Sequence, residues 1–136
     1  MPVNKVSAPI DIAVSGMQAE SLRMRIVASN IANANTTKTP SGEPYRRQEL
    51  TLVKPKGDQV TGVKVLRVSP DLATPFKTIH DPGHPDANKD GFVMMPNVDL
   101  PQEMMNLVLA SRAYQANASV MKRYQEIGDV ALELLK

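Results

Sequence analysis

The sequence predicts an α+β protein, mainly α, in which long N- and C-terminal helices pack as a coiled-coil-like pair around a small β-strand and loop insert. Of the 11 prolines, 8 fall within residues 40–96, and none falls within 10–39 or 102–136. Proline removes a backbone donor and clashes with the preceding helical turn, so this segregation predicts two uninterrupted helices. We expect a discontinuous helical domain, residues 1–39 and 97–136, and an insert, residues 40–96.

The first helix is predicted to run from near Ser7, a suitable N-cap, to about Asn33. Apolar residues recur along it at spacings of three and four, as in an amphipathic helix: Ile10, Val14, Met17, Met24, Ala28 and Ile31. Asn and Thr side chains after position 32 compete with the helical backbone ladder and should end the helix. We expect the following residues to form the joint between this helix and the insert: Asn30, Ile31, Ala32, Asn33, Ala34, Asn35 and Thr36.

The second helix is predicted to begin after Asp99, which forms a capping-box pattern with Gln102, and to continue to Lys136. One apolar stripe consists of Leu100, Met104, Leu107, Tyr114, Ala118, Met121, Leu132 and Leu135. A second stripe lies about 150° round the helix: Leu109, Ala113, Ala116, Val120, Ile127, Val130 and Leu134.

Charged residues occupy little of this helix. Six of the eight within 102–136 fall at just two heptad positions. A helix that is apolar over most of its surface must be covered on more than one side, and the first helix covers only one. The alternative is a simple two-helix hairpin with an apolar outer face. We favour contact with other subunits and predict this assembly interface: Ile10, Val14, Met17, Met24, Ile31, Leu107, Leu109, Ala113, Tyr114, Ala116, Val120, Met121, Ile127, Val130 and Leu134.

The insert is predicted to contain a hairpin, with strands over Tyr45–Val53 and Val60–Val68 around a turn at 54–58. Residues 69–98 are rich in Pro, Asp, Asn and Gly. They predict an ordered loop with one further strand near 91–94.

Composition excludes several function classes. The chain has 136 residues, a net charge of +2 and no cysteine, so disulfides and thiolate metal sites are excluded and the charge gives little support for nucleic-acid binding. No apolar run approaches the roughly 20 residues that span a bilayer. The first residues lack the apolar stretch of a cleavable signal. We expect a cytoplasmic protein, or one exported by a route that needs no such signal.

Three motifs in the insert invite a sharper interpretation. Residues 86–91 match the first half of an EF-hand loop, but the twelfth position is Asn97 instead of Glu, which favours an Asx-rich turn over a calcium-binding regulator. His80 and His84 lack a third His or Cys partner, which disfavours a catalytic zinc. Six basic residues within 45–67 favour a solvated hairpin, with a small nucleic-acid-binding module as the alternative.

No glycine-rich phosphate loop, nucleophile elbow or paired carboxylates in a cleft can be identified in the sequence. We therefore predict no enzymatic activity, no catalytic residue, no metal and no cofactor.

Several segments together carry a resemblance to a known family. Ser29–Thr36 resembles the helix-end signature of flagellar axial proteins, the rod, hook and hook-associated subunits. The long spacing before Tyr45-Arg46-Arg47 is similar to that of proximal-rod subunits. The match continues through Asp81–Val98, Glu103-Met104 and Ser111–Asn117, and so covers nearly the whole chain.

This resemblance implies a structural subunit of the flagellar basal-body rod, without catalysis, that transmits torque through packed terminal helices with the insert outside. It implies a hetero-oligomeric helical assembly without nucleic acid. The implied partners are other proximal and distal rod proteins, the rod-to-MS-ring adaptor, the MS ring and the type III export apparatus. It also implies a place in the periplasm-spanning basal body, reached without a cleavable signal peptide. The absence of cysteine suits a chain threaded unfolded into an oxidising space.

Overall fold

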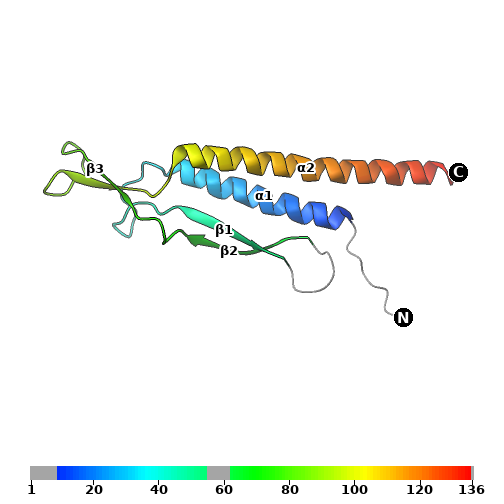
Figure 1. Ribbon diagram of the computed structural model, residues 1–136, viewed down its shortest axis with the longest axis horizontal. Helices are drawn as coiled ribbons and strands as arrows, with labels where there is room; N and C mark the ends of the chain where they lie inside the picture. Colours follow the sequence, from blue (N-terminus) through cyan, green and yellow to red (C-terminus); the bar gives the residue numbers. More distant parts are fainter. Residues whose placement is uncertain (1–8, 55–61, 136) are drawn as a thin grey trace.

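The computed structural model describes residues 9–54 and 62–135. Its elements in chain order are α1 (Pro9–Ala32), β1 (Gln48–Val53), β2 (Lys64–Pro70), β3 (Lys77–His80), β4 (Phe92–Met95) and α2 (Leu100–Glu133). The two helices lie side by side and antiparallel, and the β1–β2 hairpin runs along α1 on the side away from α2 (Figure 1). The β3–β4 hairpin projects beyond the end where α1 finishes and α2 begins (Figure 1). The predicted fold class is confirmed, whereas the proposed domain boundaries stay a prediction.

Small residues bring the two helices close together. Ala13, Ala19 and Ala110 are each at most 3% exposed. A Cβ atom placed on Gly16 would lie 2.7 Å from Asn117 Nδ2, so the backbone of α1 touches the side chains of α2 there. Small side chains at a helix crossing shorten the interaxial distance. The helix pair therefore depends on close backbone approach more than on large interlocking side chains.

The predicted apolar seam of α1 is not its buried face. Its large members Ile10, Val14, Met17, Met24 and Ile31 are only half-buried. The buried residues of α1 are Ala13, Ala19, Val27 and Asn30. At 100° per residue, the two faces differ by roughly a third of a turn. The two helices meet where their residues are small, so these larger apolar side chains lie beside that contact, and their place in an assembly interface stays a prediction.

Helix α2 extends beyond α1. Asn30 bonds to Glu103 and Gly16 lies against Asn117, and this antiparallel register places Pro9, the first described residue, opposite Tyr124. Every side chain from Lys122 to Leu135 is exposed in the described part of the chain. Neither α1 nor α2 is both long and apolar enough to cross a membrane.

The start of α2 is capped as predicted. The Asp99 carboxylate accepts the Gln102 backbone N–H at 3.2 Å, and Pro101 occupies the first turn, where a missing N–H costs nothing. The helix ends at Glu133, three residues before the predicted end. Ser7, the predicted N-cap of the first helix, lies outside the described residues.

The first predicted hairpin is present, with tighter bounds. β1 and β2 pair antiparallel, and the register shifts so that Leu66 bulges between the partners of Thr51 and Leu52. The first strand begins at Gln48 instead of Tyr45, and the second continues to Pro70 instead of ending at Val68. The predicted turn and the predicted start at Val60 fall largely outside the described residues.

A second hairpin replaces most of the predicted loop. β3 pairs with β4, with Ile79 opposite Val93. The β4 strand was expected near 91–94, but β3 was missed because all four of its residues are exposed and show no alternation. In the connection, the Asn88 side-chain oxygen accepts the N–H groups of Asp90 and Phe92, which confirms the Asx turn.

A bulky side chain at the helix contact should separate the helices. We predict that Gly16→Leu lowers the free energy of unfolding by about 1–3 kcal/mol, because the site is already filled by Asn117. The matched control is Gly128→Leu, where an added Cβ meets no heavy atom within 4 Å. Urea unfolding followed by circular dichroism measures both, and equal stability of the two variants would contradict close packing at Gly16.

Candidate functional site

The end of α1 is tied back by its own side chains. Asn33 donates to the Ser29 carbonyl from both its backbone N–H, at 3.1 Å, and its Nδ2, at 2.9 Å. Thr36 Oγ1 donates to Asn33 Oδ1 at 3.2 Å. Asn35, also predicted at the joint, is exposed and takes part in none of the described hydrogen bonds there. Asn33 thus acts as predicted at the helix end.

Asn30 is the central residue of the joint. It is 0% exposed. Its Nδ2 donates to the Gln48 carbonyl and to Glu103 Oε2, each at 3.0 Å. Its Oδ1 accepts the Gln48 N–H and the Tyr45 hydroxyl, each at 2.9 Å. Because the amide has two donor hydrogens and two acceptor lone pairs, all its hydrogen-bonding capacity is used, and one side chain joins α1, α2 and β1.

Glu103 carries a buried negative charge. Its side chain is 1% exposed, on the first turn of α2, and its Oε1 accepts from Arg47 Nε at 2.7 Å. Arg47 also forms ion pairs with Glu49 and Asp71. Burial acts to lower the pKa of Arg47, but the hydrogen bonds and charges of Glu103 and Glu49 together raise that pKa. The carboxylate is therefore neutralised by a cation from the insert.

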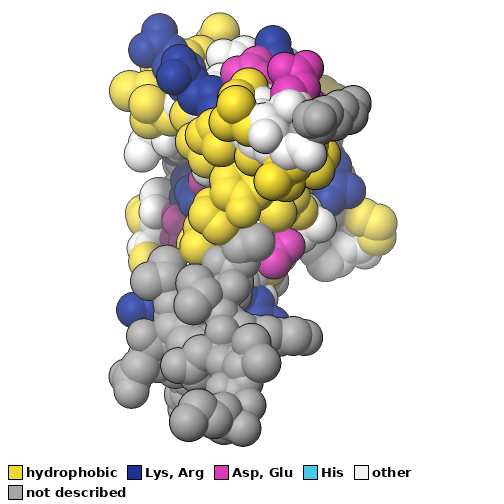
Figure 2. Space-filling model, turned by 90° about the vertical axis from the view of Figure 1, so that its right-hand side faces the viewer, with side chains coloured by type: hydrophobic (Ala, Val, Ile, Leu, Met, Phe, Trp, Pro, Cys, Tyr) yellow, Lys and Arg dark blue, Asp and Glu magenta, His cyan; other side chains and the backbone are white. Residues whose placement is uncertain are grey.

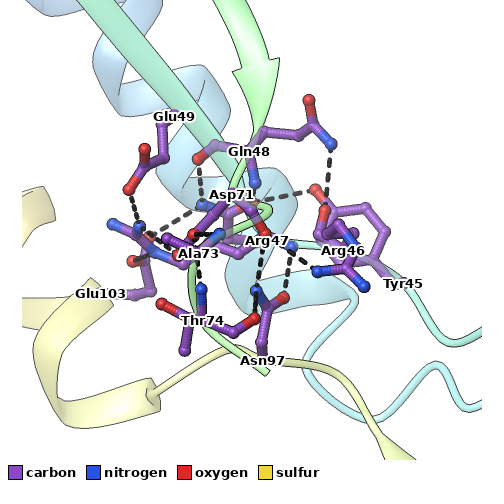
Figure 3. Close-up of polar contacts among 11 residues, drawn as sticks. Tyr45, Arg46, Arg47, Gln48, Glu49, Asp71, Ala73, Thr74, Asn97 and Glu103 are labelled. Atoms are coloured by element: carbon purple, nitrogen blue, oxygen red, sulfur yellow. Dashed lines mark hydrogen bonds and ion pairs between the residues drawn. The ribbon is translucent and has the colours of Figure 1, made fainter. Parts of the chain in front are cut away.

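A second buried amide ties the strand ends together (Figure 3). Asn97 Oδ1 accepts the Arg47 N–H at 2.8 Å, and its Nδ2 donates to the carbonyls of Asp71 and Thr74, each at 3.1 Å. The Asp71 carboxylate accepts the N–H groups of Ala73 and Thr74. The Thr74 hydrogen bonds lower the pKa of Asp71. The ionised Asp71 carboxylate therefore contributes to the free energy of unfolding above about pH 4, and this contribution is lost as the pH falls further.

We call this set the junction: Asn30, Tyr45, Arg47, Gln48, Asp71, Asn97 and Glu103. Its polar groups bond to one another and hold three elements in place, which suits positioning and offers no free nucleophile or base. The sequence predicted the Asn30–Thr36 part but missed Arg47, Asp71, Asn97 and Glu103 as its partners. The sequence did hold an indication that Glu103 faces α1, because Glu103 shares the three-and-four spacing of the α2 residues on that side.

The residues of the predicted assembly interface differ in exposure. Leu107, Ala113, Tyr114 and Met121 are half-buried. The rest of the second stripe is exposed, with the largest side chains Leu109 57%, Val120 51%, Ile127 67%, Val130 56% and Leu134 83%. Figure 2 looks at the end where α2 finishes and shows hydrophobic side chains gathered there. Their role as an interface stays a prediction.

The remaining candidate motifs are engaged within the chain. The His80 ring packs edge-on against Phe92 at 5.0 Å, and His84 Nδ1 accepts the Asp86 N–H. Asp86 accepts a hydrogen bond from Thr37, and Arg46 stacks 4.0 Å from the Phe76 ring centre. Within 9–54 and 62–135, no group of three His, Cys, Asp or Glu side chains is placed to hold a metal ion.

Comparison with known proteins decides the family. Residues 10–38 match the family described as flagella basal body rod protein, and residues 89–134 match the flagellar basal body rod FlgEFG protein C-terminal family. The flagellar basal-body rod protein FlgC of Agrobacterium fabrum is 39% identical over 138 residues, which cover 98% of each chain. The chain belongs to the flagellar basal-body rod protein family of FlgC.

Two other members of this family are also similar over most of the chain. FlgC of Salmonella typhimurium is 43% identical over 113 residues, covering 82% of this chain and 84% of the relative. FlgC of Borreliella burgdorferi is 36% identical over 146 residues, covering 93% and 95%. The two matched family regions contain Asn30 and Glu103, the two sides of the buried contact between the helices.

Replacing the Asn30 amide, which donates hydrogen bonds in the junction, by a carboxylate that cannot donate should strongly destabilise the fold. We predict that Asn30→Asp lowers the free energy of unfolding at pH 7 by at least about 3 kcal/mol, because it places an uncompensated carboxylate against Glu103. Burial and the neighbouring charge would raise the pKa of the new carboxyl, so the loss should shrink as the pH falls toward 5. The matched control is Asn35→Asp at an exposed position. Urea unfolding at both pH values tests this, and an equally mild effect of the two variants would contradict the assignment.

Proposed function

We propose that this chain is a structural subunit of the bacterial flagellar basal-body rod and that it assembles through the exposed apolar surface of α2, without catalysis. Membership of the FlgC family supports the first part. The second rests on one observation: α2 presents an apolar stripe, more than half exposed at its large residues, that α1 does not cover.

The energetics of this stripe favour burial against a neighbour. Fully burying a Val, Leu or Ile side chain stabilises by about 1.5–3 kcal/mol. Five such residues of the second stripe are more than 50% exposed: Leu109, Val120, Ile127, Val130 and Leu134. An apolar patch of this kind on one face of a helix marks an interaction surface. Repeated in every copy of a rod, such contacts would hold the assembly together.

The partners and location follow from the same proposal. Neighbours would be other proximal and distal rod proteins, the rod-to-MS-ring adaptor and the MS ring, in a hetero-oligomeric helical assembly. The protein would pass through the type III export apparatus without a cleavable signal peptide and become part of the rod that spans the periplasm.

The junction gives this proposal a mechanical element. It links both helices to the start of β1 through buried hydrogen bonds and an ion pair. A helical domain built into the rod wall would therefore hold the insert in a fixed direction outside it. Torque passing along the helices would reach the insert through these short polar contacts.

A charge placed on the exposed stripe tests the interface. We predict that Val120→Glu abolishes swimming and rod assembly while export of the protein continues, because a buried unpaired charge costs several kcal/mol at each contact. The readouts are swimming in soft agar, recovery of the protein in isolated basal bodies, and its amount outside the cytoplasm.

The matched control is Ser119→Glu, which adds the same charge one residue away on the polar side of α2. Both positions are exposed, so neither change should unfold the isolated chain. We expect the control to swim normally. Normal swimming of Val120→Glu would refute the second stripe as an interface.

A further inference from the structure

One edge of the first hairpin has no strand beside it. β1 lies between β2 and α1, so only one of its edges pairs with β2 (Figure 1). In an antiparallel pair, successive residues direct their N–H and C=O groups to alternate edges. The Asp71 N–H donates to the Arg47 carbonyl at 2.8 Å, so the Arg47 carbonyl points toward β2. The backbone groups of Gln48 therefore point to the other edge, which we call the open edge of β1.

The Asn30 amide pairs with the open edge as a strand would. Its Nδ2 donates to the Gln48 carbonyl and its Oδ1 accepts the Gln48 N–H. A residue of an adjacent antiparallel strand makes the same two bonds to the residue opposite it. The next backbone groups on this edge belong to Leu50, two residues along. Within 9–54 and 62–135, no hydrogen bond outside the hairpin involves the Leu50 N–H or its carbonyl.

A polar hollow of about 350 Å³ runs beside the open edge, between β1, α1 and α2. Its lining includes Leu50 on β1, Ile26 on α1, and Gln102 and Asn106 on α2. Gln102 and Asn106 are four residues apart, so they share one face of the helix. In the described part of the chain, neither side-chain amide takes part in a hydrogen bond. Because each amide can both donate and accept, hydrogen-bonding groups face the hollow from both sides.

The charged side chains that line the hollow are already paired. Arg23 forms an ion pair with Glu20 at 3.0 Å. Arg47 pairs with both Glu49 and Glu103. A charged ligand would have to break one of these pairs, whereas the backbone of β1 and the two amides of α2 are available. They suit an uncharged group that both donates and accepts, which is the chemistry of the peptide backbone.

We propose that an extended, uncharged segment of a neighbouring polypeptide in the rod adds to the open edge of β1 as a third strand, opposite Leu50. Its outer backbone groups bond to Gln102 and Asn106. Strand addition to an open sheet edge is a recurring mode of peptide recognition, in which main-chain hydrogen bonds supply the affinity. Asn30 ends the added strand, because it already occupies Gln48. This inference rests on the proposed function as a rod subunit and names one kind of contact within the rod.

Hydrogen exchange of single backbone amides tests the contact. It would be measured by mass spectrometry on the isolated full chain and on the same chain within purified basal bodies. The Leu50 amide should exchange at least about tenfold more slowly in basal bodies. The Glu49 and Thr51 amides point toward β2 and should be slow in both samples. A Leu50 amide that is fast in both samples, or slow in both because this chain covers it, would overturn the proposal.

A proline at position 50 removes the same donor. Proline is tolerated where the N–H points away from the sheet, so Leu50→Pro should unfold at about the same urea concentration as Leu50→Ala, the matched control that keeps the N–H. In cells that make only the variant chain, we expect at least about tenfold less Leu50→Pro than Leu50→Ala in basal bodies, because the partner carbonyl is left unpaired. Equal amounts would overturn the proposal.

A second pair of variants tests the other side of the hollow, and it replaces the first pair if Leu50→Pro is less stable than its control. Asn106→Leu removes the side-chain amide, whereas Asn106→Gln keeps one. Asn106→Leu should speed exchange of the Leu50 amide in basal bodies more than Asn106→Gln does, and equal exchange would overturn the proposal. These results leave the rod function standing. Failure of that function would appear instead as an unsubstituted chain absent from basal bodies.

Discussion

The structure depends on one fully buried amide. Asn30 sits where α1 ends, where α2 begins and where β1 begins, and its four hydrogen bonds are shared among them. A buried polar group without partners costs several times what a satisfied one contributes, so alternative placements of the strand are disfavoured. The nearby Glu103 carboxylate is also buried, and its negative charge must be paired with the Arg47 guanidinium from the insert. These contacts set the direction in which the insert leaves the helices.

The helix pair adds a complementary constraint. Its contact is built from Ala13, Gly16 and Ala19 against Ala110 and Asn117, so the larger apolar side chains are left elsewhere on the surface. Those on α2 form the stripe proposed to contact neighbours. Close packing inside the subunit and apolar exposure outside it are thus two consequences of the same distribution of side chains. A subunit of this kind can be well positioned internally and still depend on its assembly to cover its surface.

Sequence reasoning predicted the elements better than their contacts. Proline segregation identified both helices, the Asp99 cap and the existence of the first hairpin were correct, and the helix-end motif marked part of the junction. The apolar periodicity of α1 did not show where this helix meets α2, since periodicity weights large residues and the helices meet at alanine and glycine. Strand β3 was missed because an exposed four-residue strand has no hydrophobic pattern. Arg47, Asp71 and Asn97 were missed because their partners are distant in sequence and only the folded chain brings them together.

The most direct test of the central claim is a double-mutant cycle between Asn30→Ala and Arg47→Ala, measured by urea unfolding. These side chains share Glu103 as a partner from two different elements. If the junction acts as one unit, the two losses in the free energy of unfolding should be non-additive by more than about 1 kcal/mol. Losses that add to within about 0.3–0.5 kcal/mol would show that the two contacts are independent and would contradict the account.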